Sequence, residues 1–109
     1  MRGNTSRNTR LVVRVLLLEE ARRQLELEDD WWRANRDHPE VLLEDFIAAL
    51  KHLMRIPEAG KTYRTIGGKR IQRVLMRRAR CHVYYFHDRE NDQIEIHSIW
   101  GAQRRRPHL

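Results

Sequence analysis

Histidine, tyrosine, lysine and arginine side chains gather in the second half of the chain, where they could act together on a phosphate group. Cleavage of RNA without a metal needs a side chain that moves protons, which histidine or tyrosine supplies, and cations that stabilise the charge of the transition state. If the chain is an enzyme, we therefore expect a metal-independent endoribonuclease with the catalytic residues Arg73, Arg80, Tyr84 and His97. The same residue types also hold phosphates or an acidic partner without any reaction, so catalysis and simple binding both remain open.

The residue spacing excludes two other kinds of site, a nucleotide-binding loop and a metal site. Gly60-Lys61-Thr62 resembles the end of a nucleotide-binding loop, but Arg55 stands where that motif needs its first glycine, and a helix precedes it where the motif needs a strand. Cys81 is the one cysteine, so it cannot form an internal disulfide, and it shares no metal-ligand spacing with the nearby histidines. We expect no nucleotide hydrolysis, no metal and no cofactor.

The positive charge is concentrated in the C-terminal half. The chain has 109 residues and a formal net charge of +7, and we expect a disordered arm over 1–9 followed by one small domain over 10–109. Residues 1–60 hold 10 Lys and Arg against 11 Asp and Glu, whereas residues 61–109 hold 12 against 4. A solvated strand surface would also carry such charge, but its segregation favours an anion-binding surface. The residues that we expect to bind the anionic target are Lys69, Arg70, Arg73, Arg80, His82, Trp100, Arg104 and Arg105.

The elements that position these residues begin with a mainly helical half. β-branched residues predict a first strand over 11–17, and apolar residues at three- and four-residue steps then predict a helix over 18–35. Trp31-Trp32 falls in the acid-rich half, and we expect it to pack against the helix and cover its end. Asp37-His38-Pro39-Glu40 has the capping residues of a second helix, which Ile56-Pro57 ends.

Strands follow the second helix. Glycines separate short segments there, and strand-like runs occur over 70–77, 81–87 and 93–100, with a hairpin turn over 88–92. The order is strand, helix, helix, strand, strand, strand. We therefore expect an α+β fold in which a two-helix hairpin packs on one face of a small, mostly antiparallel four-stranded sheet.

The last two strands carry apolar side chains on both faces. Alternation places Tyr84 and Phe86 on the opposite face from Tyr85, and it places Ile99 opposite Ile96. Helices on one side would leave the other set uncovered, so we expect a partner, such as an amphipathic helix or an added strand, to cover part of the second face. Half-exposed strand residues without a partner are the alternative.

Taken in order, the segments from Leu11 onward resemble the RelE/ParE superfamily of toxins from bacterial type II toxin-antitoxin systems. The resemblance rests on a first strand, a helical hairpin that ends in a Pro-x-x-Gly segment, an arginine-bearing strand, a Tyr-rich strand, and a last strand that leads into a Trp-Gly and arginine tail. The segments that carry it are Arg55-Ile56-Pro57-Glu58-Ala59-Gly60, Arg70-Ile71-Gln72-Arg73-Val74-Leu75, His82-Val83-Tyr84-Tyr85 and Ile94-Glu95-Ile96-His97-Ser98-Ile99-Trp100-Gly101-Ala102-Gln103-Arg104-Arg105.

The Pro-x-x-Gly turn and the Tyr84-Tyr85 pair make the chain more similar to ParE than to RelE. Lys69, Arg73 and Arg80 match the basic residues of a RelE-type site only in part. Pro107-His108-Leu109 follows the arginine tail without the tyrosine of that site, so His97 or His108 would have to replace it.

The resemblance implies a cytoplasmic toxin of the plasmid-stabilising kind that inhibits growth through DNA gyrase or another topoisomerase. It also implies a cognate antitoxin, which neutralises the toxin in a hetero-oligomer and would contact Tyr84, Phe86 and Ile99. One alternative is a RelE-like, ribosome-dependent messenger RNA endoribonuclease. Another is a non-toxic basic binding module. None of these hypotheses involves a membrane. The apolar run over 11–18 is interrupted by Arg14 and is too short to span a bilayer.

Overall fold

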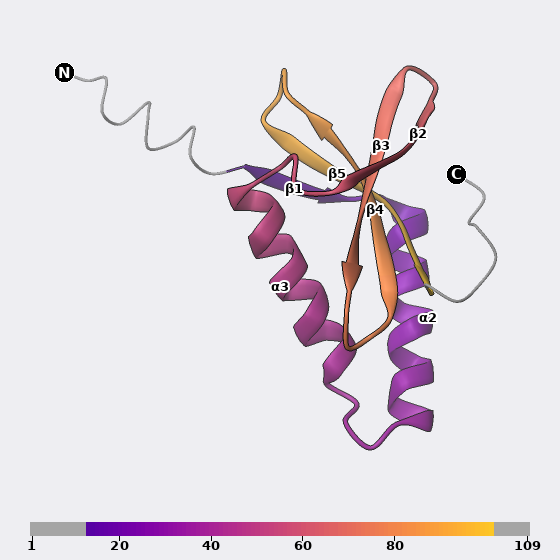
Figure 1. The fold of residues 1–109 in the computed structure, drawn as a ribbon. Coiled ribbons are helices and arrows are strands. Elements are labelled where there is room, and N and C mark those ends of the chain that lie inside the picture. The colour runs from indigo at the N-terminus through magenta and orange to yellow at the C-terminus, as the bar shows by residue number, and fades with distance from the viewer. Residues whose placement is uncertain (1–12, 102–109) are drawn as a thin grey trace.

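The computed structural model describes residues 13–101, which form two helices and five strands (Figure 1). The expected arm over 1–9 and the basic residues Arg104 and Arg105 lie outside the described residues. Neither of the two helices is long and apolar enough to cross a membrane. In chain order the elements are β1 Arg14–Leu17, α2 Glu19–Asn35, α3 Val41–Arg55, β2 Lys61–Ile66, β3 Lys69–Met76, β4 Cys81–Asp88 and β5 Gln93–Gly101.

The strands form one mixed sheet in the order β1-β5-β4-β3-β2. β1 pairs with β5 in parallel, and every other neighbouring pair is antiparallel. The expectation of a four-stranded sheet with the order strand, helix, helix, strand, strand, strand is therefore wrong, because it omits β2. The observed order has two helices after the first strand and four strands after the helices.

β2 was missed because it is a polar edge strand joined to β3 by glycines. Its exposed residues outnumber its half-buried ones, so it lacks the apolar alternation of a strand with one buried face. Gly67 and Gly68 have φ angles of 58° and 81° and connect Ile66 directly to its partner Lys69. A two-residue hairpin turn of this kind needs positive φ at both positions, which glycine adopts without strain.

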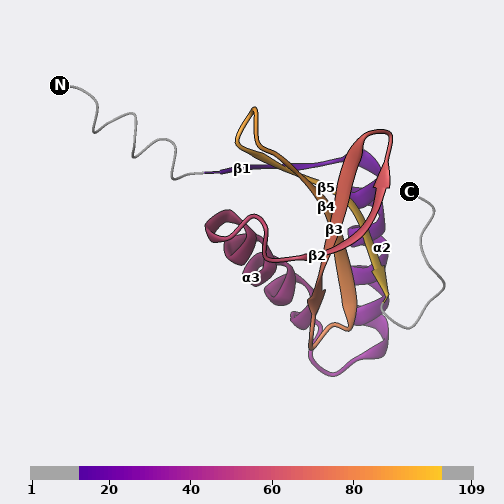
Figure 2. The same cartoon turned by 45° about the horizontal axis from the view of Figure 1, so that its top comes forward.

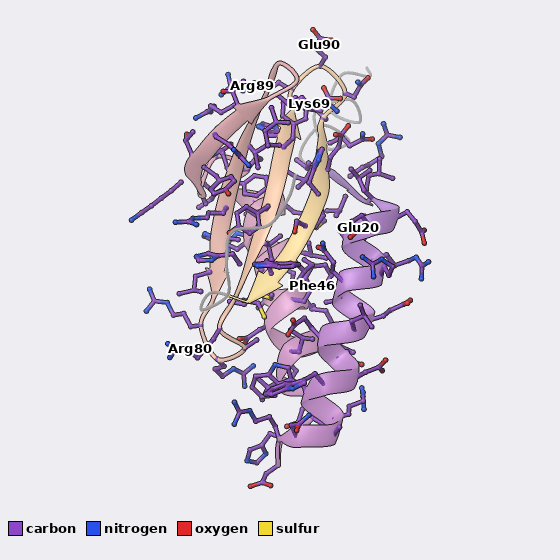
Figure 3. All side chains as sticks on the ribbon, turned by 90° about the vertical axis from the view of Figure 1, so that its right-hand side faces the viewer. Glu20, Phe46, Lys69, Arg80, Arg89 and Glu90 are labelled. Carbon is purple, nitrogen blue, oxygen red and sulfur yellow. The ribbon has the colours of Figure 1, made fainter. Side chains whose placement is uncertain are left out.

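The core lies between the two helices and the sheet. Leu42, Phe46 and Leu53 of α3 pack with Ala21 of α2. α2 also runs alongside β5, as Figure 3 shows, and α3 lies beside the sheet in Figure 2. The strand residues of the core cluster are Met76, Cys81, Val83, Tyr85, Ile94, Ile96 and Ile99.

α2 takes the place of a strand along the second half of β5. β1 pairs with β5 only as far as Ile96, so the backbone of β5 beyond that residue has no strand partner on this side. The Gln24 side-chain oxygen accepts hydrogen bonds from the Ile99 backbone N–H at 2.8 Å and from the Ser98 hydroxyl at 2.9 Å. A buried N–H needs such a partner, and the two hydrogen bonds fix α2 against the sheet.

A bulge between β4 and β5 moves Ile99 into the core. Tyr84 pairs with Ser98, but the next residue, Tyr85, pairs with Ile96, so His97 is an extra residue on β5. An extra residue reverses which side chains face the core from that point onward. The expectation that Ile99 lies on the face opposite Ile96 is therefore wrong, and its side chain is only 1% exposed.

Tyr85 fixes the turn between α3 and β2. Its hydroxyl donates to the Pro57 carbonyl oxygen at 2.9 Å and accepts from the Gly60 backbone N–H at 2.9 Å. Gln72 also donates from its side chain to the Gly60 carbonyl oxygen at 2.8 Å. These bonds explain the Pro-x-x-Gly segment and place Lys61, the first residue of β2, opposite Arg73.

Asp45 of α3 fixes the turn between β3 and β4. One carboxylate oxygen accepts from the Ala79 backbone N–H at 2.9 Å, and the other accepts from Arg78 Nε at 2.9 Å. Arg80, the last turn residue, has a φ of 55°, and its N–H bonds the Met76 carbonyl oxygen at 2.7 Å. The turn therefore presents its arginines from a fixed backbone.

Candidate functional site

A groove of about 570 Å³ lies at the edge of β3, beyond the point where β2 begins. The last pair between these strands is Lys61 with Arg73, so β3 has no strand neighbour on this side beyond Arg73. We call this the basic groove, because none of its lining residues is acidic. Its lining residues are His52, Ala59, Lys61, Arg73, Val74, Leu75, Arg77 and His82.

The three strong cations of the basic groove are not neutralised. Within residues 13–101, no carboxylate lies within ion-pair distance of Lys61, Arg73 or Arg77. Cations without counter-charges that share one concave surface attract anions, phosphates above all. Three other cations of the sheet half are paired: Lys69 with Glu95 at 2.9 Å, Arg70 with Glu58 at 2.7 Å and Arg78 with Asp45 at 2.9 Å.

Two tyrosines hold Arg73 in place. Arg73 lies opposite Tyr84 in the sheet, and its Nη1 is 3.5 Å from the Tyr84 hydroxyl oxygen. The Tyr63 ring meets the Tyr84 ring edge-on at 4.9 Å, and the Arg73 guanidinium lies 5.5 Å from the centre of the Tyr63 ring. Cation–π contacts of this kind orient a guanidinium without neutralising it.

His82 adds a neutral proton carrier to the groove. Its ring lies 5.9 Å from that of Tyr84. Burial lowers the pKa of His82 below its ordinary value of 6.5, and the nearby positive charge of Arg73 lowers it further. At neutral pH the imidazole is therefore uncharged and can accept a proton.

His97 belongs to a different cluster. Glu95 Oε1 accepts from Lys69 Nζ at 2.9 Å and lies 3.1 Å from His97 Nε2. Burial alone would raise the pKa of Glu95, but its bonds to Lys69 and His97 outweigh burial and lower that pKa overall. The carboxylate engages both neighbours, so this cluster offers less free positive charge than the basic groove.

Arg80 and Arg70 also lie outside the basic groove. Arg80 is in the turn between β3 and β4, at the opposite end of the sheet from Lys69 (Figure 3). Arg70 donates to Glu58 at 2.7 Å and to Thr62 at 3.0 Å. Glu58 also lies 2.6 Å from His87, and that hydrogen bond is the main cause of its lowered pKa. The structure thus brings Arg73, Tyr84 and His82 together but not the full set of expected catalytic residues.

The residues expected to bind an antitoxin differ in exposure. Phe86 is half-buried, and Lys69 Nζ lies 5.2 Å from its ring centre. Tyr84 is 3% exposed beneath Tyr63, and Ile99 lies in the core. Phe86 is therefore the member of this set that offers the most surface to a partner.

Sequence reasoning missed three groove residues, His52, Lys61 and Arg77, and also Tyr63, which holds Arg73. In the sequence Lys61 stands out only as part of an incomplete nucleotide-binding motif, and Tyr63 lies in β2, a strand that the sequence pattern does not predict. The Gly67-Gly68 pair is the signal for Lys61 and Tyr63, because it predicts a hairpin that brings Lys61 opposite Arg73.

Comparisons with protein-family models, curated proteins and solved structures found no match. Fold and site define a small α+β protein with an unneutralised basic groove at the edge of a mixed sheet.

Proposed function

We propose that the protein is the toxin of a type II toxin-antitoxin pair, similar to ParE, that acts in the cytoplasm and stops growth by binding a complex of DNA with gyrase or another topoisomerase. The basic groove is the observation that carries this proposal. Lys61, Arg73 and Arg77 present three unneutralised charges to one surface, which suits the phosphates of DNA. A cognate antitoxin with an acidic segment neutralises the toxin by occupying the same charges, with Phe86, farther along β4, as an apolar contact.

The arrangement of the side chains favours binding over catalysis. Of the residues expected to cleave RNA, Arg73 and Tyr84 are adjacent, but Tyr84 is nearly buried. His97 faces Glu95, and Arg80 lies in the hairpin turn away from the groove. A binding groove needs only its cations, whereas a catalytic site needs its proton carriers within hydrogen-bond reach of one substrate.

Growth arrest by groove variants tests the proposal. We expect Lys61→Gln and Arg73→Gln each to relieve the arrest that the unaltered chain causes when expressed without an antitoxin. Arg14→Gln is the matched control, because Arg14 is exposed on β1, at the opposite edge of the sheet from the groove. Undiminished arrest by both groove variants, at equal protein levels, would contradict the proposal.

A RelE-like endoribonuclease is the second candidate, and His82 is the observation that favours it. A neutral imidazole beside Arg73 and Tyr84 could accept the proton of an attacking 2′-hydroxyl. If this candidate is correct, His82→Asn abolishes messenger RNA cleavage while the variant still binds anions. Expression of the unaltered chain without any growth arrest would instead favour a non-toxic basic binding module.

A further inference from the structure

A second cavity, of about 480 Å³, lies between the end of α2 and the turn that joins β3 to β4. We call it the tryptophan pocket. Arg77 of the same turn lines the basic groove, so the two cavities flank one hairpin turn. The pocket is lined by Glu28, Trp31, Trp32, Arg36, Arg78, Ala79, Arg80, Cys81 and Gly101.

The pocket offers flat aromatic and guanidinium surfaces. The rings of Trp31 and Trp32 meet edge-on, with their centres 6.3 Å apart. The Arg36 guanidinium lies 5.0 Å from the Trp31 ring centre and 5.6 Å from that of Trp32. Trp31 is 42% exposed. Indole rings and guanidinium planes are the surfaces on which unstacked nucleic-acid bases stack.

The hairpin turn supplies the charges that flank this stacking surface. Arg80 has a φ of 55°, a conformation that residues other than glycine rarely adopt. The Asp45 anchor holds the turn in that conformation, so the turn directs Arg80 to the pocket and Arg77 to the groove. Within the described part of the chain, neither Arg36 nor Arg80 has a carboxylate within ion-pair distance.

We propose that the tryptophan pocket takes one unstacked base of a single-stranded nucleic acid. The base stacks on Trp31, and the strand crosses the hairpin turn so that its phosphates meet Arg80 and then Arg77. The inference rests on the proposed anion binding by the basic groove, and it adds a preference for single-stranded over double-stranded nucleic acid.

Fluorescence anisotropy with labelled 10-nucleotide strands tests this inference. We expect the unaltered chain to bind single strands more tightly than a duplex of equal charge, and Trp31→Ala to weaken single-strand binding by about tenfold, because stacking on one aromatic is worth about 1–3 kcal/mol. Trp31→Phe should retain most of the affinity. Leu27→Ala is the control, since Leu27 is an exposed apolar residue of α2 outside the pocket. DNA and RNA strands measured side by side identify which of the two is preferred.

Equal binding of single strands and duplex, or equal loss of both in Trp31→Ala, would overturn the inference. The result is separable from the proposed function, because Trp31→Ala leaves duplex binding intact whereas Arg73→Gln weakens both kinds of binding. If the chain arrests growth but shows no preference for single strands, the toxin proposal stands and the pocket proposal fails. If Trp31→Ala removes the preference for single strands and the unaltered chain does not arrest growth, the pocket proposal stands alone.

Discussion

Arg73 is the residue on which the properties of the basic groove depend most. It has no carboxylate partner within residues 13–101, it lies over the Tyr63 ring, and its charge contributes to the lowered pKa of His82. A guanidinium held by an aromatic ring keeps its full charge and its direction. The groove therefore presents an anchored cation beside a neutral histidine.

The titration of His82 tests this electrostatic picture. We expect NMR titration to give a pKa for His82 below 6.5, and Arg73→Gln to move it only part of the way back, because burial is the larger cause. The unfolded chain binds this proton more readily, so His82 lowers the free energy of unfolding as pH falls through 6.5 and below. An unshifted pKa, or stability that rises on acidification in the unaltered chain but not in His82→Asn, would contradict this account.

Gly60 is required by its neighbours. A Cβ atom at this position would lie 2.6 Å from the Tyr85 hydroxyl oxygen and 2.8 Å from the Arg73 carbonyl oxygen. We expect Gly60→Ala to lower the free energy of unfolding by about 1–3 kcal/mol, measured by urea denaturation. Tyr85→Phe removes the hydroxyl oxygen but keeps the ring carbon Cε1, which lies 2.8 Å from the added Cβ. Since the closest obstacle is gone, the double variant should lose less than the sum of the two single variants. Strict additivity would show that Gly60 and Tyr85 do not interact as described.

At the scale of elements, Asp45 joins α3 to the hairpin turn that separates the two cavities. Its side chain is 11% exposed and accepts one backbone and one guanidinium hydrogen bond. We expect Asp45→Ala to lower the free energy of unfolding by about 1–3 kcal/mol, because a partly buried N–H loses its acceptor. Glu44→Ala is the control and should have little effect, since Glu44 is exposed and its carboxylate pairs only with Arg78 within residues 13–101. Equal losses in the two variants by thermal denaturation would rule out the anchoring role.

The sequence predicts the elements whose hydrophobic pattern is strong. Both helices and the strands β3, β4 and β5 lie within a few residues of their expected ranges, because their apolar residues follow helical or alternating spacing. β2 could not be found in this way, since an exposed edge strand has no buried face to mark it. The shift of Ile99 into the core follows from the bulge at His97, which strict alternation cannot represent.

The candidate site was predicted only in part for the same reason. Arg73 and His82 lie on strands that the sequence identifies, and they were expected to bind the target. Lys61 joins them only because the unexpected strand β2 pairs with β3. His52 comes from α3, which the sequence places against the sheet without specifying which residues reach its edge.

At the scale of the whole molecule, the cations of α2 and those of the sheet half differ in whether carboxylates neutralise them. On α2 the arginines are paired with carboxylates one turn away, as Arg22 is with Glu19 and Glu26 and Arg23 is with Glu20. Among the described residues of the sheet half, Lys61, Arg73 and Arg77 at the groove and Arg80 at the hairpin turn have no carboxylate partner, and Arg64 of β2 has none either. The positive field therefore has a direction, which is the requirement for steering an anionic partner to one surface.

The dependence of DNA affinity on salt concentration measures that positive field. We expect the logarithm of the affinity for a short DNA duplex to fall linearly with the logarithm of the salt concentration, and Lys61→Gln and Arg73→Gln each to reduce the slope by about one. Arg14→Gln, at the far edge of the sheet, should leave the slope unchanged. A slope that none of these substitutions changes would mean that DNA binds elsewhere on the molecule.

Pulse-labelling of DNA and protein synthesis, within minutes of inducing this chain alone in bacteria, tests the proposed function most directly. The account predicts that DNA synthesis falls first while protein synthesis continues, and that Arg73→Gln delays the fall. An immediate fall in protein synthesis would contradict it and favour messenger RNA cleavage, and growth with neither label reduced would contradict any toxin function.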